Sequence, residues 1–225
     1  MASLGNYSDD YSGVISDLTA SCHKEVKSVD LRAFAPITSS VANNSSIYLV
    51  NLARSGSQYF QRVGRKTYLK SVRVTGNIAN DVQPNTLSDR IPANYVRLAL
   101  VYDRRPQGFV PTFDEIFGQV SASGTFSSDV VSQPLVINSD RFRILKDVTI
   151  PFNPATSIAN YFMATRIPVD FYIKTPNLIS EYTADNGSIS DFTTGSVYLV
   201  LKSGFPITTE NNIFSELNVR CRFTD

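Results

Sequence analysis

Tryptophan is absent from this chain of 225 residues, histidine occurs once and cysteine twice. A zinc site usually takes four ligands, mostly from cysteine and histidine, and His23 with two distant cysteines does not supply them. Cys22 and His23 are neighbours in a polar stretch, where adjacent side chains of an extended backbone point apart rather than into one cleft. We therefore predict no catalytic residue, no metal site and no cofactor.

Long apolar runs are also missing. No stretch approaches the ~20 apolar residues that a membrane-spanning helix needs, so we expect no membrane insertion. The first residues lack the positive flank and apolar run of a secretory signal peptide. Without a secretory route we expect Cys22 and Cys221 to be unpaired thiols, with a disulfide between them as the alternative.

Aromatic residues are plentiful, with 14 Phe and 11 Tyr, and together with β-branched residues they favour strands. Residues 1–24 have no hydrophobic period and read as a flexible N-terminal arm, which is acidic. Residues 25–225 read as one domain with long polar loops. Eight strands are expected, with boundaries good to ~2–4 residues. They are residues 25–34, 46–53, 66–79, 94–104, 141–152, 166–174, 195–203 and 213–224.

Alternation of apolar and polar residues assigns side chains to faces of these strands. Near the C-terminal end, Leu217, Val219, Cys221 and Phe223 alternate with polar residues and are expected in the core. The same pattern gives three further apolar faces. They are Val96, Leu98, Leu100 and Tyr102; Val197, Leu199 and Leu201; and Phe142, Ile144, Val148 and Ile150.

One short helix is expected after Thr112. The Thr112 hydroxyl can accept a hydrogen bond from the Glu115 amide, and the Glu115 side chain can reach back to complete a capping box. Eight strands without intervening helices predict an all-β fold, an eight-stranded antiparallel double-sheet jelly roll with long loops. An immunoglobulin-like sandwich is the alternative, and the absence of tryptophan counts against it.

A cationic segment stands out in a chain whose net charge is only +1. Between residues 54 and 73 there are six basic residues and no acidic one, a pattern that attracts polyanions. The expected phosphate contacts are Arg54, Arg62, Arg65, Lys66, Lys70 and Arg73, and the aromatic residues placed to stack on unpaired bases are Tyr59, Phe60 and Tyr68.

The alternative for this segment is a solvated face, or salt bridges to a neighbouring subunit. Lys70 and Arg73 are three positions apart, so in a regular strand they point to opposite faces and share a groove only if a bulge intervenes. Arg220 and Arg222 share the polar face of the last strand and could supply a second basic patch, but we expect a solvated or subunit-paired face there instead. Arg104–Pro106 is expected to be a plain turn.

Several segments in order resemble the capsid proteins of small circular Rep-encoding single-stranded DNA viruses, the geminivirus-, genomovirus- and circovirus-like agents. They are Gln61–Lys66 leading into Leu69–Val72, then Val101–Gly108, Pro111–Phe117 and Arg141–Asp147. The resemblance implies a jelly-roll subunit that self-assembles into an icosahedral shell of about sixty copies around a circular single-stranded DNA genome. It also implies a place in the virion, and in the host nucleus during assembly.

The sequence departs from this family at its start, because such proteins usually begin with an arginine-rich arm and this arm is acidic. The residues leave two other functions open. One is an oligomeric jelly-roll module that binds a ligand, as a lectin does. The other is a hydrolase on a β-scaffold, which the scarcity of histidine disfavours.

Overall fold

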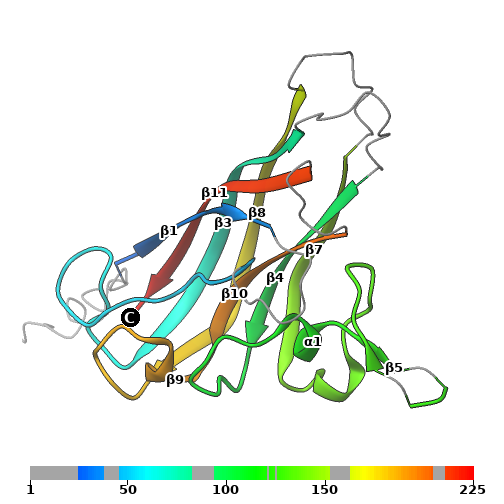
Figure 1. The fold of residues 1–225 in the computed structure, drawn as a ribbon. Coiled ribbons are helices and arrows are strands. Elements are labelled where there is room, and N and C mark those ends of the chain that lie inside the picture. Colours follow the sequence, from blue (N-terminus) through cyan, green and yellow to red (C-terminus); the bar gives the residue numbers. More distant parts are fainter. Residues whose placement is uncertain are drawn as a thin grey trace, which may run out of the picture.

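All eight expected strands form, and they pair in two antiparallel sheets that lie face to face (Figure 1). The computed structural model describes residues 25–37, 46–82, 94–120, 122–124, 126–152, 163–204 and 211–225. The five-stranded sheet consists, in spatial order, of β1 (Lys27–Pro36), β11 (Asn211–Thr224), β3 (Lys66–Val82), β8 (Met163–Tyr182) and β9 (Phe192–Thr194). The four-stranded sheet consists of β2 (Ile47–Leu49), β10 (Ser196–Ser203), β4 (Asn94–Asp103) and β7 (Phe142–Phe152).

The remaining elements are short. They are helix α1 (Phe113–Ile116), a hairpin of β5 (Gln119–Val120) with β6 (Phe126–Ser127), and the 3₁₀ turns η4 (Val136–Asn138) and η5 (Ile189–Asp191). Within the described residues, no helix is long and apolar enough to cross a membrane.

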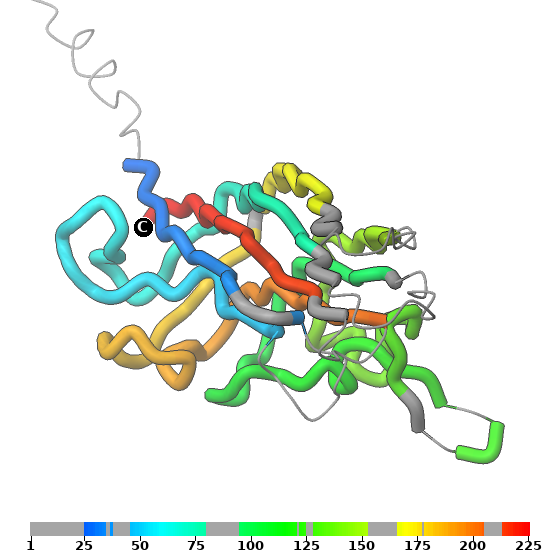
Figure 2. The backbone as a smooth tube through the Cα atoms, turned by 45° about the horizontal axis from the view of Figure 1, so that its top comes forward, coloured from blue at the N-terminus to red at the C-terminus, as the bar shows by residue number. Residues whose placement is uncertain are grey.

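Strands that are distant in sequence are neighbours in both sheets. The first expected strand pairs with the last, with Lys27 opposite Phe223, so the start of β1 lies beside the C-terminus (Figure 2). When the eight expected strands are numbered along the chain, their spatial order in the five-stranded sheet is first, eighth, third and sixth. Their spatial order in the four-stranded sheet is second, seventh, fourth and fifth. This is the jelly-roll arrangement of the prediction, and the immunoglobulin-like alternative is wrong.

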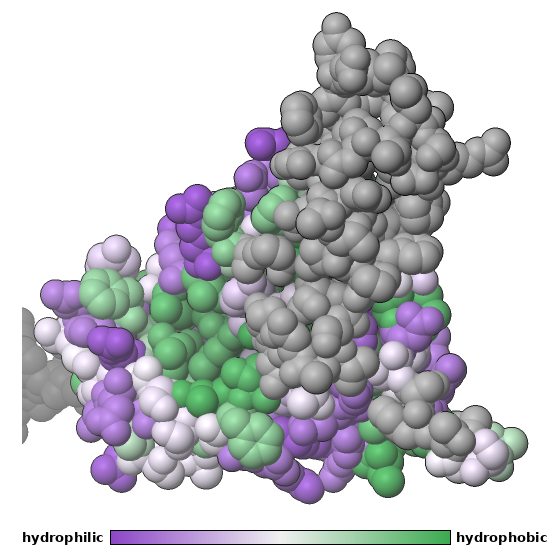
Figure 3. All heavy atoms as spheres, viewed as in Figure 1, coloured by the Kyte–Doolittle hydropathy of each residue, from purple (hydrophilic) through white to green (hydrophobic). Residues whose placement is uncertain are grey.

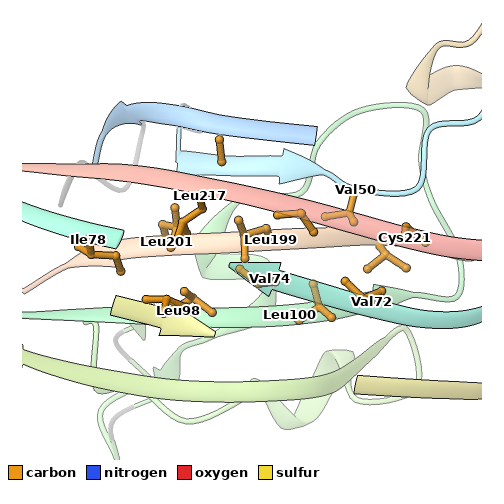
Figure 4. Close-up of a cluster of buried hydrophobic side chains, with 14 of the residues drawn as sticks. Val50, Val72, Val74, Ile78, Leu98, Leu100, Leu199, Leu201, Leu217 and Cys221 are labelled. Carbon is orange, nitrogen blue, oxygen red and sulfur yellow. The ribbon is translucent and has the colours of Figure 1, made fainter. Parts of the chain in front are cut away.

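The inner faces of the two sheets form the main core (Figure 4). Leu217, Val219, Cys221 and Phe223 are all buried, as the alternation predicted. Cys221 is a free thiol, and burial raises its pKa to about 12, so it stays protonated and unreactive at neutral pH. Cys22 and the predicted arm of residues 1–24 lie outside the described residues.

A second cluster covers the outer face of the four-stranded sheet, where α1 packs on β4 and β10. Phe113, Ile116 and Phe117 contact this face, on which Ala99 and Tyr198 are buried. The helix begins as predicted, because Thr112 Oγ1 accepts the Glu115 amide at 3.3 Å. The Glu115 carboxylate binds Arg141 at 3.1 Å instead of reaching back, so only half of the expected capping box forms.

The expectation that Phe142, Ile144, Val148 and Ile150 share one face is wrong. The β4–β7 register shifts between Ile144 and Lys146, which leaves Leu145 as the extra residue of a β-bulge. Phe142 and Ile144 therefore belong to the outer cluster, while Val148 and Ile150 belong to the main core.

Candidate nucleic-acid interface

A β-bulge places Lys70 and Arg73 on the same face of the five-stranded sheet, the outer face, which points away from the core. Leu69 is opposite Phe223 of β11, but Ser71 is opposite the adjacent Arg222, so Lys70 is an extra residue in β3. Both Lys70 and Arg73 are exposed, whereas Leu69 is buried in the core. The bulge that Lys70 and Arg73 need in order to line one groove is therefore present.

Three cations line up across the strands at this bulge. Ser71 pairs with Arg222 of β11 on one side and with Lys174 of β8 on the other, and Lys70 precedes it. We call Arg222, Lys70 and Lys174 the cation row. All three are exposed, and within the described part of the chain none forms an ion pair with a carboxylate.

Two tyrosines flank the cation row. Tyr172, opposite Arg73 on β8, is 55% exposed, and Tyr68 lies two residues before Lys70. With Lys174 they border an open hollow of about 300 Å³. Its lining residues are Tyr68, Leu69, Lys70, Tyr172, Lys174 and Pro176. Flat rings beside unpaired cations are what a single strand of nucleic acid requires from its binding surface.

The next row of the same face is neutralised. Arg220 pairs with Asp30 at 2.7 Å and Arg73 with Asp170 at 3.0 Å. The hydrogen bonds in these pairs raise the pKa of both guanidinium groups, and the bond from Arg220 lowers the pKa of Asp30. A second open hollow, of about 600 Å³, lies over Arg73, Arg220 and Asp30.

Tyr59 lies beside this neutralised row. Its carbonyl oxygen accepts the Ser28 amide at 3.1 Å, which holds the loop of residues 54–65 against β1. The Tyr59 phenol is close enough to Arg220 to contribute, after the larger effects of Asp30, to the raised pKa of that arginine. Its ring meets Phe60 edge-on, with centroids 5.2 Å apart, and both rings are exposed.

Arg62 has to be removed from the predicted phosphate contacts, because its side chain is only 1% exposed. Its guanidinium is fully engaged inside the protein. The partners are the carbonyl oxygens of Ala53, Gly64 and Ala184, the Asp185 carboxylate at 3.1 Å, and the Tyr182 ring, whose centroid is 4.1 Å away. Arg62 fixes the loop of residues 54–65 to the rest of the domain and has no free donor face for a ligand.

The other predicted contacts lie at the end of β3 or away from the outer face. Arg54 is exposed and packs over Gly187, where an added Cβ would stand 2.3 Å from its Cγ. Arg65 is exposed, and its carbonyl oxygen accepts the Tyr182 amide at 2.8 Å. Lys66 forms an ion pair with Glu181 at 3.1 Å, which raises the pKa of the lysine.

Sequence reasoning missed Lys174 and Tyr172. A signal was present, since Asp170, Tyr172 and Lys174 occupy alternate positions of one expected strand. Nothing in the sequence showed that this strand is the neighbour of β3. Among the residues that the structure describes, no group of three His, Cys, Asp or Glu side chains converges as a metal site.

Comparison with known proteins identifies a family. The sequence model of the geminivirus coat protein/nuclear export factor BR1 family matches residues 13–225. No curated protein sequence matches the chain.

Solved structures give weak likenesses. The unassembled KI polyomavirus VP1 pentamer is 10% identical, with 89% of this chain and 94% of that chain covered and a TM-score of 0.27. Trichodysplasia spinulosa-associated polyomavirus VP1 in complex with GM1 oligosaccharide is 11% identical, with coverages of 89% and 93% and a TM-score of 0.23. TM-scores this low support no functional inference.

Proposed function

This chain belongs to the geminivirus coat protein/nuclear export factor BR1 family, and from that premise we propose that it builds an icosahedral shell around circular single-stranded DNA. It is a viral capsid protein, found in the virion, and it associates with copies of itself. The proposal adds that the shell contains about sixty copies, the smallest closed icosahedral set, and that assembly passes through the host nucleus.

The cation row is the observation that carries the DNA-binding part of this proposal. Neighbouring strands lie ~4.8 Å apart, so Arg222, Lys70 and Lys174 stand within ~10 Å of one another. Three cations at this spacing repel one another, and no carboxylate among the described residues pairs with them. A phosphate backbone that crosses the strands relieves this repulsion and releases its counterions.

The tyrosines favour single strands over a duplex. The rings of Tyr68 and Tyr172 border the hollow beside the cation row, within reach of bases whose phosphates contact Lys70 and Lys174. Each base that stacks on an aromatic ring contributes about 1–3 kcal/mol, and only unpaired bases have a free face to offer. The proposed contacts are thus Lys70, Lys174, Arg222, Tyr68 and Tyr172, while Arg73 and Tyr59, which the sequence also predicted, belong to the neutralised row beside them.

The test removes the cation row and compares a matched control. The variant Lys70→Gln/Lys174→Gln/Arg222→Gln loses three exposed cations from the outer face. The control Arg104→Gln/Arg143→Gln/Lys146→Gln loses three exposed cations from β7 and the turn after β4. We expect the first variant to form shells with much less nucleic acid, and the control to package like the parent chain.

Binding to a labelled single strand is the second measurement. The slope of log K against log salt is negative, and each lost phosphate contact makes it shallower by about 0.7. The slope of the first variant should therefore be shallower than that of the parent by about 2. Equal nucleic acid content and equal salt dependence in both variants would reject the cation row as the DNA contact.

A further inference from the structure

One surface lobe contains almost no charge. Residues 119–139, which we call the apolar lobe, include a single charged residue, Asp129, in a chain that is 18% charged. Of this lobe the structure describes residues 119–120, 122–124 and 126–139. Four of its apolar side chains stand largely in solvent. They are Val120 (63% exposed), Val131 (61%), Val136 (84%) and Ile137 (81%).

The exposure of these side chains does not arise from a loosely held loop. The buried side chain of Arg97 donates to the carbonyl oxygens of Val130 and Ser132 on either side of Val131, and it also pairs with Asp147. Its guanidinium lies 3.7 Å from the centroid of Phe117. A buried arginine therefore holds the lobe backbone on both sides of Val131, whose side chain is exposed.

The lobe is joined to α1 as well. The Leu135 amide donates to the Ile116 carbonyl at 2.9 Å, and the Asn138 side chain donates to the Glu115 carbonyl at 2.8 Å. A rigid protrusion with exposed apolar groups and few charges has the composition of the centre of a protein–protein contact.

A second uncharged surface lies at the opposite edge of the four-stranded sheet. We call it the β2-edge surface, and it consists of residues 47–53, 106–113 and 186–190, which contain no charged residue. Two of its segments touch, because an added Cβ at Gly108 would lie 3.8 Å from Ser190 Cα.

The β2-edge surface is also apolar. Leu49, Val110 and Ile189 are half-buried over the outer cluster, and Phe109 is 51% exposed. Figure 3 shows an apolar area on this side of the molecule, to the right of the loop of residues 54–65 and of the chain that precedes β9. The described residues therefore carry one apolar protrusion and one apolar area on the same sheet.

We infer that the apolar lobe of one copy packs on the β2-edge surface of the next copy of this chain. The β5–β6 part of the lobe projects away from β2 and from the chain next to β9 (Figures 1 and 2), so these parts of the two surfaces do not meet within one molecule. A contact between different surfaces of identical subunits is head-to-tail, and such contacts form rings when the rotation between copies closes.

This inference rests on the proposed function, because it identifies one contact of the shell. Its first test is Val136→Asp/Ile137→Asp in the full chain, with Val63→Asp as control, since Val63 is 70% exposed and belongs to neither surface. We expect the parent chain and the control to form particles by electron microscopy and sedimentation. The double variant should stay a small species with an unchanged melting temperature.

Particles formed by the double variant as efficiently as by the parent would overturn the contact and leave the coat function standing. Loss of assembly in Val63→Asp as well would also overturn it, because the lobe would then have no special role. A parent chain that forms no particles with single-stranded DNA would instead reject the coat function itself.

Cross-linking tests the head-to-tail geometry. In a Cys22→Ser background, Ile137→Cys and Phe109→Cys are prepared separately, mixed, assembled and oxidised. We expect a disulfide between copies in the mixture and none in either variant alone. Dimers of Ile137→Cys alone would show that lobe meets lobe, and would overturn the inference.

Discussion

Arg73 lies directly opposite Arg220 across the β3–β11 pair, and each guanidinium binds an aspartate on its other side. Asp170 on β8 is 3.0 Å from Arg73, and Asp30 on β1 is 2.7 Å from Arg220. Like charges opposite each other on adjacent strands repel, and the two aspartates relieve that repulsion. The outer face thus carries one balanced row beside the unbalanced cation row.

Neutralising the two aspartates that pair with Arg73 and Arg220 should strengthen DNA binding. In Asp30→Asn/Asp170→Asn, two exposed arginines lose their carboxylates and gain freedom to contact phosphate. We expect tighter binding of a single strand at low salt and a steeper salt dependence, by about 1.4 in the slope of log K against log salt. The melting temperature should change little, because exposed ion pairs contribute little to stability. An unchanged slope in fluorescence anisotropy titrations would contradict this.

Arg62→Ala should destabilise the fold without a specific effect on DNA contacts. The substitution leaves three carbonyl oxygens near the buried guanidinium without their donor. We expect the free energy of unfolding to fall by about 3 kcal/mol, which lowers the melting temperature by about 6–12 °C for a chain of this size. Arg65→Ala, at an exposed neighbouring position, is the control and should melt like the parent. Equal melting of the two variants would show that Arg62 is not a structural anchor.

Lys202→Met should stabilise the protein at neutral pH. The Lys202 ammonium is buried 4.0 Å from the Phe113 ring centroid and has no hydrogen-bond acceptor among the described residues. Burial lowers its pKa, so the folded state binds this proton less tightly than the unfolded state does. Stability of the parent therefore rises with pH between the folded pKa and the ordinary lysine value.

The methionine variant lacks this titration. We expect its free energy of unfolding to exceed that of the parent by about 1 kcal/mol at pH 7, with the difference shrinking as the pH approaches about 10.5. Denaturant unfolding at several pH values measures this. Lys146→Met, at an exposed position, provides the comparison and should show no such trend.

Tyr172→Ala should weaken single-strand binding, whereas Tyr172→Phe should not. Loss of one stacking ring costs about 1–3 kcal/mol, so affinity should fall by about 5- to 150-fold. Phenylalanine keeps the ring face, which separates stacking from a contact of the hydroxyl group. Binding of duplex DNA should respond less, since its bases are already stacked. Equal losses in both variants would point to the hydroxyl group instead.

Strand positions were predictable because they depend on local patterns. The alternation through Leu217, Val219, Cys221 and Phe223 reports which side chains face the core wherever the strand happens to pair. The start of α1 was predictable for the same reason, since Thr112 and Glu115 are three residues apart.

Bulges and the burial of Arg62 were not predictable, because they depend on distant residues. Arg62 is buried by backbone oxygens from residues 53, 64 and 184, which only the folded chain brings together. Lys70 and Lys174 are about a hundred residues apart and meet through the β3–β8 pairing. The expected strand ended at residue 174, whereas β8 continues past Pro176, where proline cannot donate to the ladder and the register with β3 shifts.

The bulge at Lys70 has an evolutionary consequence. Since this residue has no cross-strand partner in the register of either neighbouring strand, its side chain can be exchanged without moving any core residue. Under the proposed function, a single codon change at Lys70 therefore alters the charge of the cation row and its attraction for DNA, while the architecture that the neighbouring residues specify stays the same.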